Sequence, residues 1–316
     1  MRRLLKSGIR RIAGSEGPVN DVQHPALPRG QRNATVVSVA AQKGGVGKTT
    51  TSVNLASALV REHGLRVLLM DVDPQGHVYT AMKKQVHAGG GALSSVLTDE
   101  RGGREVMEIA TETMLEGLDV TPCDPRLAGA EDLLGTRIGK EFILRDALQV
   151  TRTHYDVIVI DCPPNLGNLT LNALVASDYV LVPCDPSPLA VNGVDALIGT
   201  VSTIANRLNP NIDILGLLMT RVDGRNTTLN ETVRSQLEAA YGEVMLDVNI
   251  GINNSLAQAQ MAGMDIFEQR GCKLPSCYVT EEATARARAA AFIGTLQASY
   301  TDFHYLRDVW RRSTEK

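Results

Sequence analysis

Short apolar runs alternate with longer amphipathic stretches through most of the chain. The apolar runs lack polar alternation, which is typical of strands buried on both faces of a parallel sheet, and they cover residues 35–41, 66–71, 118–122, 156–161, 179–183 and 212–220. Stretches of helical length lie between them, at residues 49–63, 140–151, 190–208 and 229–240. This alternation predicts an α/β fold, with a doubly wound, mostly parallel sheet, helices on both faces and a ligand site at the carboxyl ends of the strands.

The two ends of the chain differ from this central part. Residues 13–34 are rich in glycine, proline and polar side chains, and they predict a flexible linker. Residues 279–312 predict one or two closing helices. We therefore expect a basic N-terminal arm and linker at 1–33, a main domain at 34–299 and a C-terminal helix at 300–316 that packs on the main domain. The apolar residues on one face of that helix are Tyr300, Phe303, Leu306 and Trp310.

Charge and cysteine content narrow the class of protein. The net charge of −3 excludes a uniformly basic nucleic-acid binder, although residues 1–32 hold seven basic side chains against two acidic ones. The five cysteines are odd in number and contain no CxxC pair, which disfavours a disulfide framework or a structural zinc site. No apolar run reaches the length of a membrane span, and we expect a cytoplasmic protein.

The strongest chemical signal stands directly after the first predicted strand and before a helix. It reads Gln42-Lys43-Gly44-Gly45-Val46-Gly47-Lys48-Thr49-Thr50, with glutamine where a full phosphate-loop pattern has its first glycine. Three glycines let backbone N–H groups close around phosphate oxygens, and the helix N-terminus adds further donors. Lys48 is predicted to bridge the β- and γ-phosphates, and the Thr49 hydroxyl to ligate Mg²⁺. A glycine-rich turn with a surface lysine is the plainer alternative.

Lys43, five residues before Lys48, makes the chain resemble the ParA/MinD (Soj-like) family of deviant Walker P-loop ATPases. The resemblance covers roughly residues 34–295 and is closest to ParA-type partition and positioning ATPases. Four further segments carry it: Leu69-Met70-Asp71-Val72-Asp73-Pro74-Gln75-Gly76, Leu127-Ala128-Gly129-Ala130-Glu131, Tyr155 to Pro164 and Thr220-Arg221-Val222-Asp223-Gly224-Arg225.

The resemblance implies a role for each of these residues. Two subunits would sandwich two ATP molecules, and Lys43 of each would reach the phosphates of the other. Asp73 would orient the attacking water, while Thr49, Asp71 and Asp161 would form or support the magnesium shell. Both Asp71 and Asp73 are also able to cap the following turn. The nucleotide-binding set is Lys43, Gly44, Gly45, Val46, Gly47, Lys48, Thr49, Thr50, Asp161 and Pro163, with Lys43, Lys48 and Asp73 as its catalytic members.

The sequence leaves two surfaces open for such an ATPase, DNA and a membrane. DNA-segregating relatives carry basic residues in the region that corresponds to 248–258, and this chain has none there. Other basic residues would form a phosphate-binding patch if they cluster in space. They are Arg221, Arg225, Arg270, Lys273, Arg286 and Arg288. Residues 1–13 form a basic amphipathic pattern for which DNA, a protein partner and a membrane all remain open, as do a disordered tail and a misassigned start codon.

The resemblance as a whole implies a ParA-like ATPase that cycles between an ATP-bound sandwich dimer and an ADP monomer. Its cargo would be a plasmid, a chromosome region or a protein assembly, its hydrolysis slow and stimulated by a ParB-like partner, and nonspecific DNA its expected surface, with nucleoid association. The alternative is a MinD-like membrane-associated regulator. Bacterial tyrosine kinases have a similar loop, but the few, dispersed tyrosines disfavour that class. Nitrogenase-type iron–sulfur reductases share the fold, but the absence of glycine-flanked cysteine motifs disfavours them.

Overall fold

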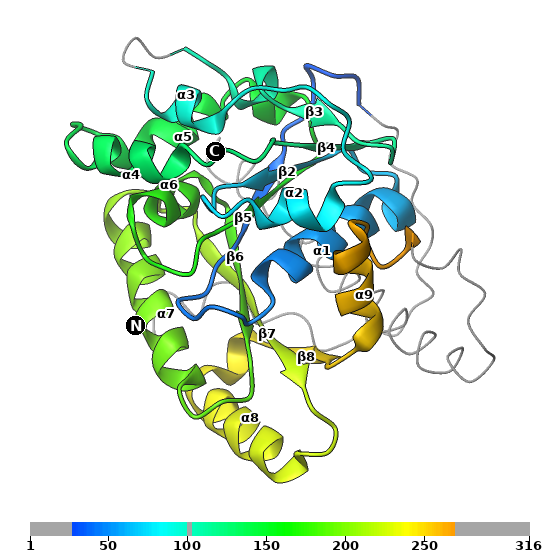
Figure 1. The fold of residues 1–316 in the computed structure, drawn as a ribbon. Helices are drawn as coiled ribbons and strands as arrows, with labels where there is room; N and C mark the ends of the chain where they lie inside the picture. The colour runs from blue at the N-terminus through cyan, green and yellow to red at the C-terminus, as the bar shows by residue number, and fades with distance from the viewer. Residues whose placement is uncertain (1–26, 100–102, 269–316) are drawn as a thin grey trace, which may run out of the picture.

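The computed structural model describes residues 27–99 and 103–268, which form a layered α/β domain (Figure 1). Its strands are β1 (Thr35–Val39), β2 (Val67–Asp71), β3 (Thr111–Glu112), β4 (Leu118–Val120), β5 (Val157–Asp161), β6 (Tyr179–Cys184), β7 (Asp213–Val222) and β8 (Met245–Gly251). Its helices are α1 (Lys48–His63), α2 (His77–Met82), α3 (Leu93–Leu97), α4 (Leu127–Gly135), α5 (Ile143–Ala147), α6 (Asn168–Ala176), α7 (Ala190–Arg207), α8 (Thr227–Tyr241) and α9 (Asn254–Ala262). Four 3₁₀ turns complete the set: Val106–Glu108, Lys140–Phe142, Thr151–Thr153 and Gly242–Val244.

The described strands form one eight-stranded sheet in the order β3-β4-β2-β5-β1-β6-β7-β8. Every neighbouring pair is parallel except β3 and β4, so the prediction of a mostly parallel, doubly wound sheet is confirmed. The chain winds from β1 toward β2 and β4 in one direction and toward β6, β7 and β8 in the other. The loop after β1 therefore lies where ligands of open parallel sheets bind.

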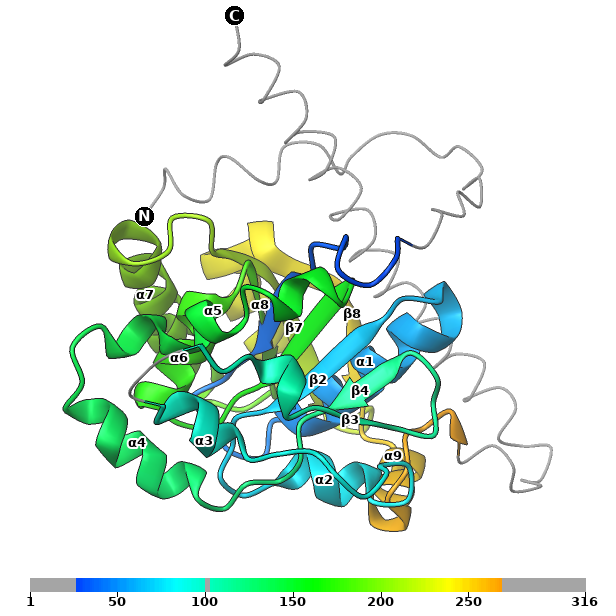
Figure 2. The ribbon, with the colours of Figure 1, turned by 90° about the horizontal axis from the view of Figure 1, so that it is seen from above.

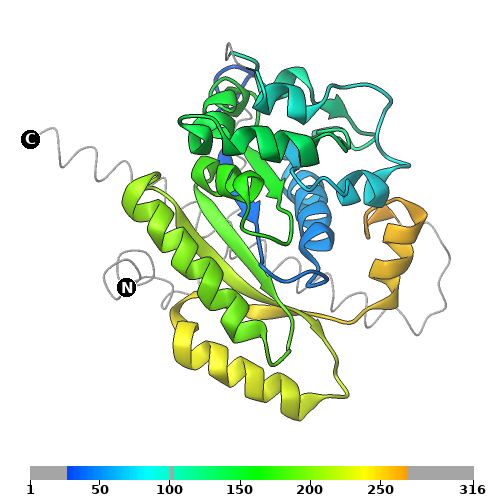
Figure 3. The same ribbon diagram turned by 60° about the vertical axis from the view of Figure 1, so that its left-hand side comes forward.

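Each face of the sheet has its own hydrophobic core, because successive strand residues point to opposite faces. On one face Val37, Val39 and Leu69 pack against α1 and α2. On the other face Val36 and Met70 belong to the core that includes buried residues of α3 to α8. Figures 1 and 2 show α7 and α9 at opposite sides of the molecule, and Figure 3 shows α7 and α8 side by side.

The single helix predicted over residues 140–151 is wrong, because the structure divides this stretch into a 3₁₀ turn, the short α5 and a second 3₁₀ turn. Tertiary hydrogen bonds explain the division. The backbone N–H groups of Val150 and Thr151 donate to the Glu105 carboxylate, at 3.2 and 3.1 Å, and so are drawn away from a continuous helical ladder. The side chain of Asn172 likewise accepts the N–H of Leu144.

The predicted linker also needs a correction at its end. The N–H groups of Gly30 and Arg32 both donate to the carbonyl of Thr153, and the Arg32 guanidinium pairs with Asp156. Residues 30–34 are therefore fixed to the domain. The basic arm at 1–13 and the C-terminal helix at 300–316 lie outside the described residues.

Strands β3 and β8 and helices α2, α3, α6 and α9 were not predicted. Strand β8 pairs with β7 in an irregular register and is only partly buried, so its apolar run is weak. Helix α6 begins four residues after the double proline that follows the predicted fourth strand, and α9 follows β8 after a two-residue connection. Both helices matter for the site, because they begin at the carboxyl edge of the sheet.

Candidate nucleotide site

The loop between β1 and α1 has the backbone of a phosphate cradle. Gly45 and Gly47 adopt φ angles of 76° and 86°, in the left-handed region that favours glycine. Helix α1 begins at Lys48 with Gly47 as its N-cap, and no side chain caps its first turn. A Cβ atom on Gly47 would have no heavy atom within 4 Å. The open space and the uncapped donors of α1 fit an anionic group such as a phosphate.

The two lysines of the loop point to different places. Lys48 is 7% exposed, and its Nζ donates to the carbonyl of Lys43 at 3.1 Å, across the loop. Burial lowers the pKa of Lys48, while the nearby charges of Asp161 and Asp73 act in the opposite direction. The side chain of Lys43 is 41% exposed, and its Nζ lies 2.6 Å from an Asp185 carboxylate oxygen. Lys48 is thus held at the cradle and Lys43 at its rim.

Asp161, the last residue of β5, is fully buried and holds the start of α1. Its two carboxylate oxygens accept hydrogen bonds from Thr49 Oγ1 at 2.7 Å and from Ser52 Oγ at 2.9 Å. Burial raises the pKa of Asp161 to about 6, although these two bonds and the Lys48 ammonium lower it. The buried carboxylate is therefore satisfied by the residue that the sequence predicts as a magnesium ligand.

The carboxylates of Asp71 and Asp73 extend this acidic group. Asp71 is the strand neighbour of Asp161, and burial together with that charge raises its pKa well above the usual value. Its oxygens accept the N–H groups of Asp73 and Val78, both at 3.0 Å, while Asp73 accepts the N–H of Gln75 at 3.0 Å. Both residues thus cap the following turn, and they also lie beside Asp161.

The loop after β5 lies against the phosphate loop. Pro163 is buried, and the side chain of Pro164 would be 4.0 Å from a Cβ atom on Gly44. The carbonyl of Thr50 accepts a hydrogen bond from the Asn54 side chain at 2.8 Å. The nucleotide-binding residues predicted from the sequence are therefore brought together around one loop.

Three contacts on the β6–β7 side were not predicted. Ser187, in the connection after β6, shares the Lys43 ammonium with Asp185, at 3.0 Å. Thr220 Oγ1 donates to the carbonyl of Val46 at 2.7 Å, and Arg221 Nη1 to that of Gly45 at 2.9 Å. Among the described residues Arg221 is the one non-glycine residue with positive φ, at 54°. Arg221 belongs to the segment 220–225 that carries the family resemblance, but its contact with the phosphate loop is visible only in the structure.

The structure describes two of the six basic residues that the sequence predicts for a phosphate-binding surface. Arg225 forms an ion pair with Asp223 at 2.8 Å, and Arg221 lies on the phosphate loop. Arg270, Lys273, Arg286 and Arg288 lie outside the described residues. Within residues 27–99 and 103–268, no three His, Cys, Asp or Glu side chains group to hold a metal ion. A Mg²⁺ ion that takes a hydroxyl, substrate phosphates and water needs no such group.

The parallel sheet, the glycine loop after β1 and the Thr49–Asp161 pair define a P-loop nucleotide-binding protein. A family profile described as an AAA domain matches residues 34–214. The chain belongs to the ParA/Soj family of P-loop ATPases. It is 37% identical to chromosome partitioning protein ParA of Caulobacter vibrioides over 265 residues, 81% of this chain and 97% of that one. It is 38% identical to sporulation initiation inhibitor protein Soj of Bacillus subtilis over 232 residues, 73% and 90% of the two chains.

A solved structure of similar identity comes from Mycobacterium smegmatis. That protein, described as a cobyrinic acid a,c-diamide synthase, was solved with bound ADP and magnesium. It is 36% identical to this chain, with a TM-score of 0.63, and the match covers 77% of this chain and 98% of that one. The described part of this chain contains no helix long and apolar enough to cross a membrane.

Proposed function

We propose that this protein is a Mg²⁺-dependent ATPase that works as an ATP-bound sandwich dimer and positions a cargo. The glycine loop and the N-terminus of α1 bind the phosphates of ATP, and Thr49 with Asp161 holds Mg²⁺. The ion neutralises charge on the phosphates when bound. The relative that was solved with bound ADP and magnesium supports the nucleotide site. The relative that is named a chromosome partitioning protein supports the positioning of a cargo.

The observation that carries the dimer is the divergence of the two lysines. The Lys48 ammonium is turned toward its own loop, so it serves the nucleotide of its own subunit. The Lys43 ammonium lies at the rim on a partly exposed ion pair, from which it can reach phosphates that a second copy brings to this face. A second cation that arrives only in the dimer stabilises charge that develops during phosphoryl transfer, which makes full activity depend on dimerisation.

The acidic group divides into two tasks. Asp161 fixes the Thr49 hydroxyl, and Asp71 supports the turn that carries Asp73 through the N–H groups of Asp73 and Val78. One carboxylate oxygen of Asp73 accepts the N–H of Gln75, and the Asp73 carboxylate also lies close enough to Lys48 to act on its charge. Asp73 thus orients the attacking water.

The cargo is a plasmid, a chromosome region or a protein assembly, and a ParB-like partner accelerates slow hydrolysis. The two relatives of nearly equal identity carry different names, a chromosome partitioning protein and a cobyrinic acid a,c-diamide synthase, and the second was solved with bound ADP and magnesium. Positioning requires two states with different affinity for a surface. The surface is nonspecific DNA in the cytoplasm, which the ATP dimer binds. Attachment to a membrane is the less favoured alternative.

The experiment measures binding of the Asp73→Ala protein to a nonspecific DNA duplex, with ATP and with ADP, across a salt series. We expect a stable ATP dimer, because Asp73 has lost its catalytic role, and ATP-dependent binding that weakens steeply with salt. Asp132→Ala, an exposed acidic residue on α4, is the control and should hydrolyse ATP as the unchanged protein does.

Two other results would change the proposal. Normal hydrolysis by Asp73→Ala removes this residue from catalysis. A protein that dimerises with ATP and ignores DNA contradicts the DNA surface, and sedimentation with anionic lipid vesicles then tests the membrane alternative directly.

A further inference from the structure

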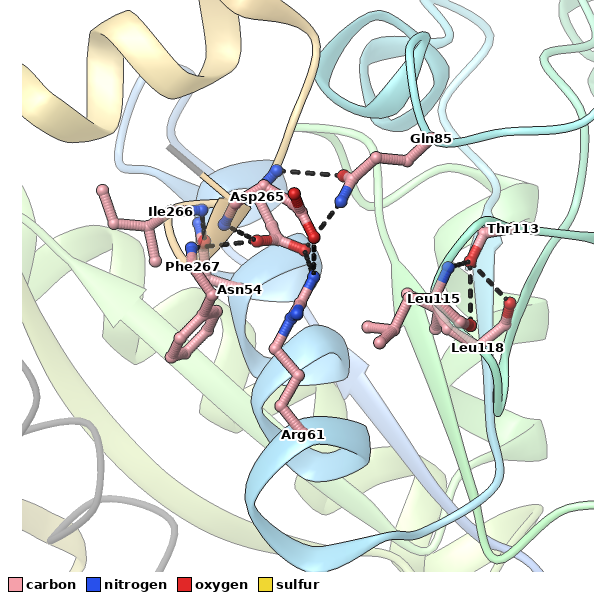
Figure 4. A network of polar contacts seen from close by, with 10 residues as sticks. Asn54, Arg61, Gln85, Thr113, Leu115, Leu118, Asp265, Ile266 and Phe267 are labelled. Atoms are coloured by element: carbon pink, nitrogen blue, oxygen red, sulfur yellow. Dashed lines mark hydrogen bonds and ion pairs between the residues drawn. The ribbon is translucent and has the colours of Figure 1, made fainter. Parts of the chain in front are cut away.

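The chain segment after α9 is tied to α1 and to the end of α2 by one buried carboxylate, Asp265 (Figure 4). Asp265 is 1% exposed. One of its oxygens accepts the N–H groups of Phe267 and Glu268, each at 2.9 Å, and the other accepts Gln85 Nε2 at 3.0 Å and Arg61 Nη2 at 3.3 Å. This carboxylate therefore joins three parts of the chain that are distant in sequence.

Two further contacts make the junction reciprocal. The N–H of Asp265 donates back to Gln85 Oε1 at 3.0 Å, so these two residues are joined by a pair of hydrogen bonds. The N–H of Ile266 donates to Asn54 Oδ1 at 2.9 Å, and Asn54 in turn holds the carbonyl of Thr50 beside the phosphate loop. We call Asn54, Arg61, Gln85 and Asp265 the Asp265 anchor.

Each element that the anchor joins starts at the carboxyl edge of the sheet. Helix α1 begins at the phosphate loop, α2 begins four residues after Asp73, and α9 begins after the connection at 252–253. The N–H of Ile252 donates to the carbonyl of Val222 at 3.0 Å, which holds this connection against the end of β7. Helix α9 is thus fixed at its start by β7 and beyond its end by the anchor.

The charges of the site indicate which side of the phosphate loop faces the base. Asp71 and Asp161 end β2 and β5, and Asp73 follows β2. All three lie on one side of β1 and fit the magnesium ion and the terminal phosphate. The sugar and the base of a bound nucleotide therefore extend toward β6, β7 and β8. On that side Arg221 lies on the phosphate loop, and Ile252 is 56% exposed.

We propose that the Asp265 anchor sets the base selectivity of the nucleotide site. Its residues touch no nucleotide and are positioning residues, because they fix α9 and, through it, the connection at 252–253 that forms the base-side wall. This inference rests on the proposed nucleotide site. The anchor also couples that wall to α1, so the wall and the phosphate cradle keep a constant distance.

The test compares dissociation constants for ATP, GTP and inorganic tripolyphosphate on the full chain. Gln85→Leu removes both bonds of the reciprocal pair with little change in volume, and Asp265→Asn removes the charge that faces Arg61. We expect either variant to lower the ratio of ATP to GTP affinity by about tenfold, which corresponds to one misplaced hydrogen bond, with tripolyphosphate affinity unchanged. Combining Gln85→Glu with Asp265→Asn restores a bonded pair and should recover much of the ratio.

The matched control is Asp124→Asn, another buried aspartate that accepts backbone N–H groups, but at the start of α3. It should lower stability and leave the ratio of ATP to GTP affinity unchanged. An unchanged ratio in folded Gln85→Leu protein, or an equal loss of tripolyphosphate affinity, overturns the inference. Failure of the unchanged protein to bind either ATP or tripolyphosphate would instead overturn the nucleotide site itself.

Discussion

The two flanks of the phosphate loop are built in different ways. On the flank of β2 and β5, three carboxylates are buried and bonded to backbone amides or hydroxyls, as Asp161 is to Thr49. On the flank of β6 and β7, side chains reach the loop from outside, and the ion pair of Lys43 with Asp185 is partly exposed. The first flank fixes its groups before any ligand arrives, whereas the second holds a cation in a contact that can be exchanged.

The difference follows from the cost of each arrangement. A buried carboxylate without partners costs several kcal/mol or shifts its pKa, so the acidic flank must be saturated with hydrogen bonds. An exposed ion pair contributes only about 0.2–1 kcal/mol, so its loss is easily offset by a new partner. We therefore expect substitutions at the cradle and the acidic flank to have large effects, and substitutions on the second flank to shift an equilibrium.

The largest effect is expected for Lys48→Ala. The Lys48 ammonium is buried at the cradle, and removing one partner of a buried charged contact costs about 2–5 kcal/mol. Nucleotide affinity should fall by about a hundredfold or more, measured by titration of a fluorescent ATP analogue. Lys84→Ala, at an exposed lysine on the same face as α1, is the control. Near-normal affinity of Lys48→Ala would place the phosphates elsewhere.

A smaller effect, of opposite sign, is expected for Asp185→Asn. The substitution weakens the contact that holds Lys43 at 2.6 Å and leaves the lysine free to reach a second copy. ATP-dependent dimerisation, measured by sedimentation equilibrium, should strengthen by up to about fivefold, given the energy of an exposed ion pair. Lys43→Ala should keep some nucleotide affinity and lose hydrolysis, measured by titration of the ATP analogue and by release of phosphate. Weaker dimerisation of Asp185→Asn would show that this pair belongs to the dimer itself.

The same contrast explains what the sequence predicts well. The acidic flank lies in short continuous segments at strand ends, such as residues 69–76, and the parallel sheet brings strand ends to one edge. The alternation of buried strands and helices, the glycine loop and the residues around it therefore follow from local pattern, and the sheet and the family membership are confirmed. The individual roles of Asp71, Asp73 and Lys43 in catalysis stay predictions.

The second flank depends on contacts between residues far apart in the chain, which no local pattern contains. Lys43 and Asp185 of the second flank are 142 positions apart, and in the Asp265 anchor, which lies outside that flank, Gln85 and Asp265 are 180 apart. The helix predicted at 140–151 failed for a similar reason, because Glu105 takes the amides that would have continued it. Polar partners far away in the chain therefore explain both why these residues were missed and why the predicted helix was wrong.

The smallest effect is expected for Asp124→Asn, which lies outside both flanks and tests at a separate buried carboxylate how much a saturating set of hydrogen bonds contributes to stability. Asp124 follows β4 and accepts the N–H of Ser94 at 2.7 Å in the first turn of α3. Burial raises its pKa, but hydrogen bonds from Ser94 and Arg126 outweigh this, and the pKa lies below the usual value. A carboxyl group with a lowered folded-state pKa stabilises the fold above its unfolded pKa of about 3.9, and this stabilisation is lost as the pH falls through the folded value.

The variant should therefore unfold more easily by about 0.3–1 kcal/mol near neutral pH, the size of a charge at a helix N-terminus. The difference should shrink as the pH falls below about 4, where the aspartate of the unchanged protein takes up a proton. Urea unfolding of both proteins at a series of pH values measures it, and the difference between them cancels the acid sensitivity that they share. A difference that stays constant down to about pH 3 would mean that the shape of the side chain and not its charge matters at this position.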